Sequence, residues 1–412
     1  MKAYSGRWLR VAVLLCGMAG VVCAQFQLAL RPATRTFPAP DALKSAALWD
    51  TRDFLTGWGA VSATAAEEHR NFDAKCDVFG HTAYSVRGLF EHGKLTSITF
   101  VMLDSGAWFG FVPDADVKRV AATKGPQFTA LYKQTAADVE RGLAALAGKA
   151  GRKVALVDKG VLKQDVLVFH TGELWARLTL RENQLVKFTV TRTEPDVVSP
   201  LSAQRRTAKR DEQAHAFAAR VSNAPNGDRV IEGVPIFIQG DRAYCGVATL
   251  AMAMHFLGLR LDTEDYAGAA GIKFGSTYHS DIRAVFDAAA DAAKLKLSRT
   301  TQFEFEKARV AIDAGMPVIV FRRWSQERDF LHGAFAQRFQ NDLAATLPKP
   351  DLSDQKSWPT KDNFAHSSII TGYNLARREV IFTESWGERS RNRRMRIEEM
   401  EGTSYMAYYP HL

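Results

Sequence analysis

The sequence predicts an α+β protein with two folded units, the first rich in β-hairpins and the second combining apolar helices with strands. The chain has 412 residues, more than the roughly 100–200 that one domain usually needs. β-Hairpin patterns dominate residues 41–200, whereas helical and strand patterns alternate after residue 229. Hydrophobic residues make up 46% of the chain and charged residues 24%, a composition typical of globular proteins and not of disordered ones.

Residues 1–24 are predicted to be a secretory signal peptide that does not belong to the fold. A basic start precedes an apolar run over residues 11–22, and small side chains follow where a signal peptidase would read. Cleavage is therefore expected before Gln25. A membrane anchor is the alternative, but the run is shorter than the ~20 residues that span a bilayer. No later stretch is apolar enough to be transmembrane, so we expect an exported, periplasmic or extracellular protein.

The charge of the chain gives little reason to expect nucleic acid as a partner. The formal net charge is +9, and three of those charges lie within the predicted signal. The remainder is modest for a chain of this length and is typical of a solvated surface. The arginines between residues 389 and 396 form a denser cluster. They are interpreted as a solvated strand-and-loop edge, with docking to an acidic partner as the alternative.

Two cysteines, Cys76 and Cys245, follow the predicted signal. An exported protein could join them in a disulfide. The alternative is two free thiols, one reactive and one buried. The residues around Cys245 favour the second possibility, and Cys76 is then expected to be a structural thiol.

The N-terminal unit, residues 25–200, is predicted to be a β-rich α+β domain. Strand patterns occur over residues 82–103 and again over 164–191, with a helix expected over 134–150. We find no nucleophile–base pair, phosphate loop or metal-ligand spacing in this unit. A separate folded module is the plainest interpretation, while a substrate-recruiting module and an inhibitory segment over the cleft stay open.

Residues 201–228 are predicted to be a basic linker helix and turn, with a possible processing site among its arginines at 205–210. The second folded unit is then expected to span residues 229–412. Its helices are expected over residues 245–257, 280–295, 303–314 and 329–343, and its strands over 230–238, 318–321, 367–371 and 379–384.

Four residues of the C-terminal unit have the local settings that thiol chemistry requires. Cys245 lies where a loop becomes an apolar helix, and the N–H groups of a helix start favour a thiolate and can bind an oxyanion. Gln239 supplies a second donor if the loop folds back. His366 opens a strand, where a base is held rigidly. Glu384 ends the next strand and can orient the imidazole, with Trp386 covering the pair.

These residues resemble the papain-like clan of cysteine peptidases, and more closely the peptidase C39-like family. The resemblance rests on the spacing from Gln239 to Cys245, on His366 with the turn at residues 372–374, and on Ser-Trp-Gly at 385–387. It covers about residues 229–397, well under half of the chain.

The resemblance implies a papain-like fold in which the cysteine helix packs on an antiparallel sheet that carries His366 and Glu384. It implies Gln239 as the oxyanion-hole donor and Cys245 as the nucleophile. It also implies His366 as general base and acid, and Glu384 as the orienting third member. Papain-type enzymes have Asn in the third position and C39-like proteins usually Asp, so Glu384 departs from the pattern of the family.

The expected function is an exported cysteine peptidase or amidase that cleaves peptide or amide bonds through a thioester. A transamidase or acyltransferase would use the same residues and differ only in the acceptor. A catalytically inactive, peptide-binding relative is a third possibility, which the departure at Glu384 keeps open. We expect a peptide or protein substrate and no metal or cofactor, and the sequence does not indicate an oligomeric state. Residues 322–324 are expected either to line a substrate cleft or to face solvent.

Overall fold

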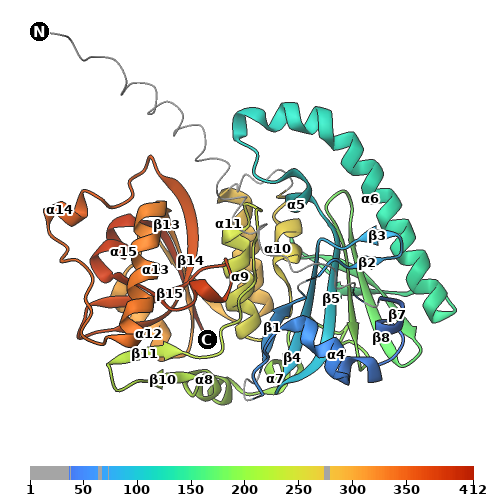
Figure 1. Cartoon of the computed structure of the whole chain (residues 1–412), viewed down its shortest axis with the longest axis horizontal. Helices are drawn as coiled ribbons and strands as arrows, with labels where there is room; N and C mark the ends of the chain where they lie inside the picture. Colours follow the sequence, from blue (N-terminus) through green and yellow to red (C-terminus); the bar gives the residue numbers. More distant parts are fainter. Residues whose placement is uncertain (1–36, 38, 64–66, 73, 273–278) are drawn as a thin grey trace, which may run out of the picture.

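The structure of the protein, a computed structural model, describes residues 37, 39–63, 67–72, 74–272 and 279–412. The predicted signal peptide lies outside these residues, so export stays a prediction. Among the described residues, no helix combines the length and the apolar character needed to cross a membrane. Helices and antiparallel sheets are mixed throughout, as Figure 1 shows.

A seven-stranded antiparallel sheet forms the centre of the N-terminal part, by which we mean the described residues up to 200. Its strand order is β1-β4-β5-β9-β8-β7-β6, with β2 and β3 paired separately. The strands are β1 (Glu68–Asn71), β2 (Asp77–Val78), β3 (His81–Thr82), β4 (Ser85–Glu91), β5 (Lys94–Asp104), β6 (Arg152–Val157), β7 (Gln164–Thr171), β8 (Leu174–Arg181) and β9 (Leu185–Thr191). The short helices are α3 (Ala39–Ala42), η1 (Ala47–Asp50), α4 (Arg52–Leu55), η2 (Thr56–Trp58), α5 (Ser105–Phe109) and η3 (Asp114–Asp116).

One long helix, α6 (Val117–Ala147), covers the outer face of this sheet (Figure 1). Its buried Phe128 and Val139 share an apolar cluster with Phe188 of β9. The sequence predicted a helix only from residue 134 onward, and the structure extends it N-terminally through Pro126. A proline inside a helix removes one backbone hydrogen bond, a cost that packing of the helix against the sheet outweighs here.

The two faces of the N-terminal sheet differ in character because side chains alternate along a strand. Phe188 points toward α6, whereas Lys187 and Thr189 belong to the opposite face. Arg87 of β4 and Thr99 of β5 are paired in register with each other, and Thr99 is paired with Thr189. This second face carries polar side chains at these positions and turns toward the C-terminal part of the chain, since Lys187 pairs with Asp262 and Asp265.

The C-terminal part, residues 229–412, is built on an eight-stranded antiparallel sheet, to which the linker contributes β10 and the first residue of β11. Its main order is β10-β11-β14-β13-β17-β12, and β15 pairs with β14 and β16. The strands are β10 (Val221–Asn223), β11 (Asp228–Ile231), β12 (Lys296–Thr300), β13 (Val318–Trp324), β14 (Phe364–Asn374), β15 (Glu379–Thr383), β16 (Arg393–Arg396) and β17 (Ser404–His411). The helices are α9 (Cys245–Phe256), α10 (Thr263–Ala269), α11 (His279–Ala292), α12 (Phe305–Asp313), α13 (Gln326–Asn341), α14 (Leu352–Gln355), η4 (Glu388–Ser390) and α15 (Ile397–Thr403).

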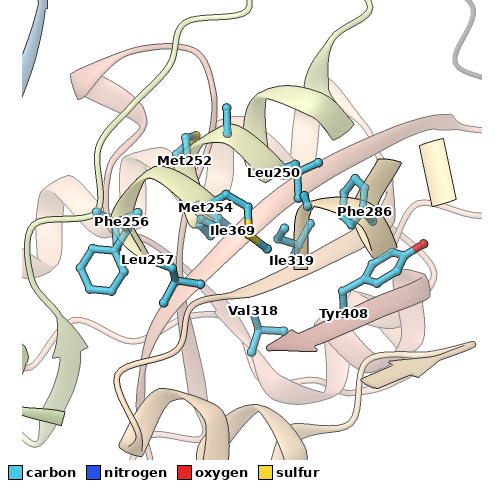
Figure 2. Close-up of a cluster of buried hydrophobic side chains, with 14 of the residues drawn as sticks. Leu250, Met252, Met254, Phe256, Leu257, Phe286, Val318, Ile319, Ile369 and Tyr408 are labelled. Atoms are coloured by element: carbon cyan, nitrogen blue, oxygen red, sulfur yellow. The ribbon is translucent and has the colours of Figure 1, made fainter. Parts of the chain in front are cut away.

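Helix α9 lies between this sheet and the N-terminal part, and it is buried along almost its whole length. Figure 2 shows Leu250 and Met254 packed against Ile319 of β13 and Ile369 of β14. A helix that is apolar on all sides is typical of a protein interior. The start of α9, and with it Cys245, is therefore held firmly against the sheet.

The linker packs against the C-terminal part instead of standing free. It contains α7 (Ala203–Thr207) and α8 (Arg210–Ala218). Arg205 is buried and donates to the carbonyl oxygens of Leu257 at 2.9 Å and Ala293 at 2.7 Å. Because Arg205 is buried in this way, a processing protease could not reach it, and only the later arginines of this stretch remain as a possible processing site.

The expectation of a solvated edge for the arginines between residues 389 and 396 is wrong for the centre of that cluster. Arg394 is buried and pairs with Asp228 of β11 and with Glu379 of β15. Arg393 pairs with Asp329 of α13. The strand β16 uses these charges to attach itself to neighbouring elements, because a buried charge requires a partner.

Candidate active site

Cys245 is the first residue of α9, and its thiol is free and half-buried. The next residue, Gly246, permits the first turn of the helix to lie close to its neighbours. A Cβ at that position would lie 2.6 Å from Ile282 Cδ1 and 3.1 Å from Phe321 Cε1, closer than side chains pack. The local sequence thus allows a thiol at a helix start that is pressed against the sheet.

A hydroxyl pair fixes α9 to the strand that carries His366. The Thr249 Oγ1 atom lies 2.8 Å from Ser367 Oγ in a buried contact. Thr249 is one turn after Cys245, and Ser367 is next to His366 on β14. This hydrogen bond adds a specific polar contact to the apolar packing between the cysteine helix and the histidine strand.

The structure brings His366 and Glu384 together at the end of the paired strands β14 and β15. The His366 Nε2 atom lies 2.7 Å from Glu384 Oε2, and both side chains are buried. The ring of Trp386 stacks on the imidazole with 4.6 Å between ring centroids and an interplanar angle of 26°. The longer carboxylate of Glu384 thus reaches the imidazole, and an indole covers one face of the ring.

The second oxygen of Glu384 binds two further residues, neither of which the sequence indicated as a partner of Glu384. Arg322 Nη2 donates to Glu384 Oε1 at 2.7 Å, and Ser368 Oγ donates to the same oxygen at 2.8 Å. Arg322 is a direct neighbour of His366 across β13 and β14. Its side chain is only 1% exposed, so neither solvent nor an open cleft surrounds it, and the expectation for this residue is corrected.

These contacts set the charge states of the pair. Burial alone would raise the pKa of Glu384, but the charges of His366 and Arg322 and the hydrogen bonds from His366 and Ser368 lower it to about 2. Burial alone would lower the pKa of His366, but the charge of Glu384 and side-chain hydrogen bonds with Cys245 and Glu384 raise it to about 9. At neutral pH the site therefore holds a carboxylate and an imidazolium, with the imidazolium in contact with Cys245.

The loop that carries Gln239 is bonded to Ser385, the residue directly after Glu384. The Gln239 backbone N–H donates to Ser385 O at 2.9 Å, and Ser385 Oγ donates to Gln239 Oε1 at 2.6 Å. The amide nitrogen donates one of its two hydrogens to Arg242 O at 3.1 Å. Ser385 thus fixes the orientation of the amide and leaves its second N–H for another acceptor.

Cys76 has the opposite setting. It is a free thiol, 1% exposed, within the apolar core of the N-terminal part. Burial, followed by the nearby charge of Asp77, raises its pKa to about 12. A buried thiol of this kind is unreactive, which leaves Cys245 as the candidate nucleophile.

A second group of titratable side chains, formed by Glu67, His69 and His255, lies at the boundary between the two parts. One ligand atom of each lies within 4.8 Å of the other two, as in a metal site. However, Arg260 Nη1 contacts Glu67 Oε1 and lies 2.9 Å from His255 Nδ1. The guanidinium supplies the cation in this group, so we interpret it as an ion-paired contact between the two parts.

Comparisons with known proteins identify a family for the part of the chain that carries this site. Residues 231–410 match the model of the peptidase C39-like family, which confirms the resemblance that the sequence indicated, and the mixed helices and antiparallel sheet agree with the fold of that family. No curated protein matches the chain. A solved structure from Bacillus anthracis, described as a C39-like peptidase, shares 16% sequence identity with a TM-score of 0.29, covering 43% of this chain and 96% of that chain. The family match indicates a cysteine peptidase-type function.

Proposed function

We propose that residues 231–410 form a thiol hydrolase that cleaves peptide or amide bonds, with Cys245 as nucleophile and His366 as general base and acid. One observation carries the proposal: a single buried imidazole contacts the half-buried thiol of Cys245 and, 2.7 Å away, the carboxylate of Glu384. An imidazole between a nucleophile and an orienting carboxylate is the arrangement that activates a weak nucleophile.

In the first half of the reaction, the deprotonated sulfur of Cys245 attacks the substrate carbonyl and forms the C–S bond. The negative charge moves to the carbonyl oxygen, where the N–H groups at the start of α9 and the free amide N–H of Gln239 stabilise it. His366 donates its proton to the leaving nitrogen as the C–N bond breaks. The amine departs and a thioester remains on Cys245.

In the second half, water replaces the amine. Neutral His366 removes a proton from the water, whose oxygen attacks the thioester carbonyl. The C–S bond then breaks, the carboxylic acid product leaves and the sulfur keeps its electron pair beside the imidazolium. Glu384 stabilises the imidazolium in both halves, and Arg322 and Ser368 hold Glu384 in place.

Turnover of a fluorogenic peptide library by the purified full chain tests this function. Replacing Cys245→Ala removes the nucleophile, so kcat/KM should fall by at least about 10³-fold. Cys76→Ala is the matched control, because that thiol is buried in the N-terminal core and should be dispensable. Equal turnover by wild type and Cys245→Ala would exclude the mechanism.

The acceptor is identified by mass spectrometry of the products with and without an added primary amine. Hydrolysis predicts a free carboxylic acid in both cases. A product that is predominantly the new amide would instead identify the enzyme as an acyltransferase.

A further inference from the structure

The loop that carries Gln239 and leads into Cys245 is held together by one buried side chain, Arg242. Its Nε atom donates to Gln239 O at 2.7 Å and its Nη2 atom donates to Ile238 O at 3.0 Å. In return, the Gln239 amide donates to Arg242 O at 3.1 Å. The guanidinium is therefore an internal brace, and the position of Gln239 depends on where that guanidinium lies.

The position of the brace is set from the N-terminal part of the chain. Arg242 Nη1 donates to Asp104 Oδ2 at 3.3 Å and to Glu264 Oε1 at 2.8 Å. Asp104 is the last residue of β5, in the N-terminal sheet, whereas Glu264 belongs to α10. One of the two carboxylates that bind Arg242 thus lies outside the peptidase-like part.

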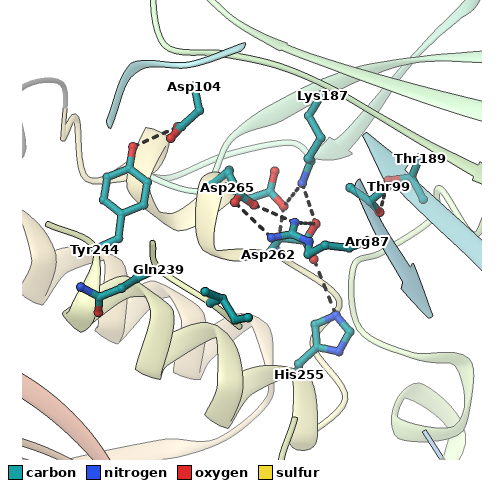
Figure 3. Close-up of polar contacts among 12 residues, drawn as sticks. Arg87, Thr99, Asp104, Lys187, Thr189, Gln239, Tyr244, His255, Asp262 and Asp265 are labelled. Carbon is teal, nitrogen blue, oxygen red and sulfur yellow. Dashed lines mark hydrogen bonds and ion pairs between the residues drawn. The ribbon is translucent and has the colours of Figure 1, made fainter. Parts of the chain in front are cut away.

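The residue next to Cys245 is bound to the same carboxylate. Tyr244 OH donates to Asp104 Oδ1 at 3.0 Å and accepts from the Gly106 backbone N–H at 3.1 Å. Figure 3 shows Tyr244 and Asp104 facing each other across the boundary, with Gln239 on the same side as Tyr244. Asp104 therefore holds two residues, one on the oxyanion loop and one directly before the nucleophile.

This contact is sealed from solvent and built from opposite charges. Asp104 and Arg242 are each 3% exposed, and Tyr244 and Glu264 are each 1% exposed. Arg87 of β4 adds two hydrogen bonds to Glu264, at 2.8 and 3.1 Å. Because a buried ion left without its partner is strongly destabilised, the two parts of the chain are expected to stay docked while the site operates.

The loop itself is shaped for this docking. Gly240 has φ of +61°, and a Cβ there would lie 2.9 Å from Tyr84 OH of the N-terminal part. The guanidinium of Arg242 also lies 5.3 Å from the centre of the Tyr84 ring. A side chain at residue 240 would be both strained and crowded, so glycine there suits a loop that packs directly on the N-terminal part.

We propose that the N-terminal part completes the active site, with Asp104 as a positioning residue that orders Gln239 and Cys245 through Arg242 and Tyr244. The inference rests on the proposed thiol hydrolase function. On this inference the N-terminal part is neither a detachable recruiting module nor an inhibitory cover. The reason is that the N-terminal part contacts the loop that must be ordered for catalysis.

The test uses the full-length protein with Asp104→Asn and, separately, Tyr244→Phe. Asp104→Asn removes the charge that holds Arg242, and Tyr244→Phe removes the hydroxyl while keeping the ring. Both should lower kcat at least tenfold with KM changed less than twofold, because substrate contacts stay and the reacting groups lose their order. Combined, the two changes should lower kcat by less than the product of the separate effects, since both act through one carboxylate.

The matched control is Gln164→Ala, which removes the 2.8 Å hydrogen bond from Gln164 to Asp265 in the same buried boundary. Gln164 belongs to β7 and Asp265 to α10, not to the loop at residues 238–245. The control should lower the thermal unfolding midpoint without changing kcat. A kcat within twofold of wild type in both Asp104→Asn and Tyr244→Phe would overturn the inference, as would an equal loss of kcat in Gln164→Ala.

Hydrogen exchange measured by mass spectrometry separates this inference from the hydrolase proposal. Asp104→Asn should accelerate amide exchange in residues 238–246, and Gln164→Ala should not. If wild type shows no turnover but this acceleration is observed, the hydrolase proposal fails while the ordering of the loop by Asp104 stands. Unchanged exchange in Asp104→Asn would overturn the ordering itself.

Discussion

Glu384 determines how charge is distributed in the candidate site. One of its oxygens binds His366 and the other binds Arg322 and Ser368. In this chain a glutamate at the end of β15 is compatible with orienting the imidazole, because its carboxylate is fixed from two sides.

The pH dependence of turnover tests the role of Glu384. The pKa of His366 is raised to about 9, so its imidazolium is present below that pH and is lost as pH rises through it. The activity that depends on this proton should therefore fall on the alkaline side near pH 9. In Glu384→Gln the main charge that raises the pKa is gone, and the alkaline limb should move to lower pH by one unit or more.

Glu384→Asp is the matched control, since it keeps the charge and shortens the side chain by one methylene. Its kcat should fall while its alkaline limb stays nearer to that of wild type. An alkaline limb that is identical in wild type and Glu384→Gln would show that Glu384 does not set the protonation of His366.

The sequence indicated Gln239, Cys245, His366 and Glu384 because each has a recognisable local setting. Their catalytic roles stay proposals, but the structure places His366 against Glu384 and bonds the loop of Gln239 to the residue directly after Glu384. Arg322 could be singled out only as a possible cleft or surface residue, not as a partner of Glu384. Its closeness to His366 depends on the register between β13 and β14, and neither strand contains information about that register by itself. The sequence offered one signal for a buried charge here, because Arg322 directly follows the four apolar residues 318–321.

At the scale of elements, the contact between α9 and β14 keeps the thiol beside the imidazole. Thr249→Val keeps the shape of the side chain and removes the hydroxyl that bonds Ser367. Because the buried Ser367 hydroxyl loses a partner, the free energy of unfolding should fall by about 1–3 kcal/mol. Chemical denaturation measures this change.

The double variant Thr249→Val with Ser367→Ala provides the internal control. If the two hydroxyls stabilise the protein through each other, the losses should not add, since the second change also removes the unsatisfied group. Additive losses would show that the pair does not join the helix to the strand.

The sequence located most helices and strands but misjudged two kinds of element. The helical pattern predicts this helix only from residue 134, whereas α6 begins at Val117 and continues through Pro126. The arginines of β16 were assigned to solvent, whereas Arg394 is buried between Asp228 and Glu379. Both errors arise because tertiary contacts outweigh local preference.

At the scale of the whole molecule, the two parts share a buried boundary that composition does not reveal. Lys187 of β9 is 2% exposed and pairs with Asp262 and Asp265 at 3.1 and 2.6 Å. Read along the chain, Lys187 is an ordinary polar residue in an alternating strand, which normally faces solvent. Apolar side chains contribute to the same boundary, since Val166 and Val168 of β7 belong to the buried cluster of the C-terminal part. The sequence therefore predicted two modules and not their close attachment.

The central claim is that Cys245 and His366 act as one chemical unit, and alkylation of the thiol tests this most directly. Native protein is treated with iodoacetamide at pH 7, and the labelled residue and its rate are measured by mass spectrometry in wild type and in His366→Ala. The account predicts one rapidly formed adduct, on Cys245, and a rate at least about tenfold lower in His366→Ala, because the imidazolium no longer stabilises the sulfur anion. Equal rates in the two proteins, or no labelling of Cys245 in folded wild type, would contradict it.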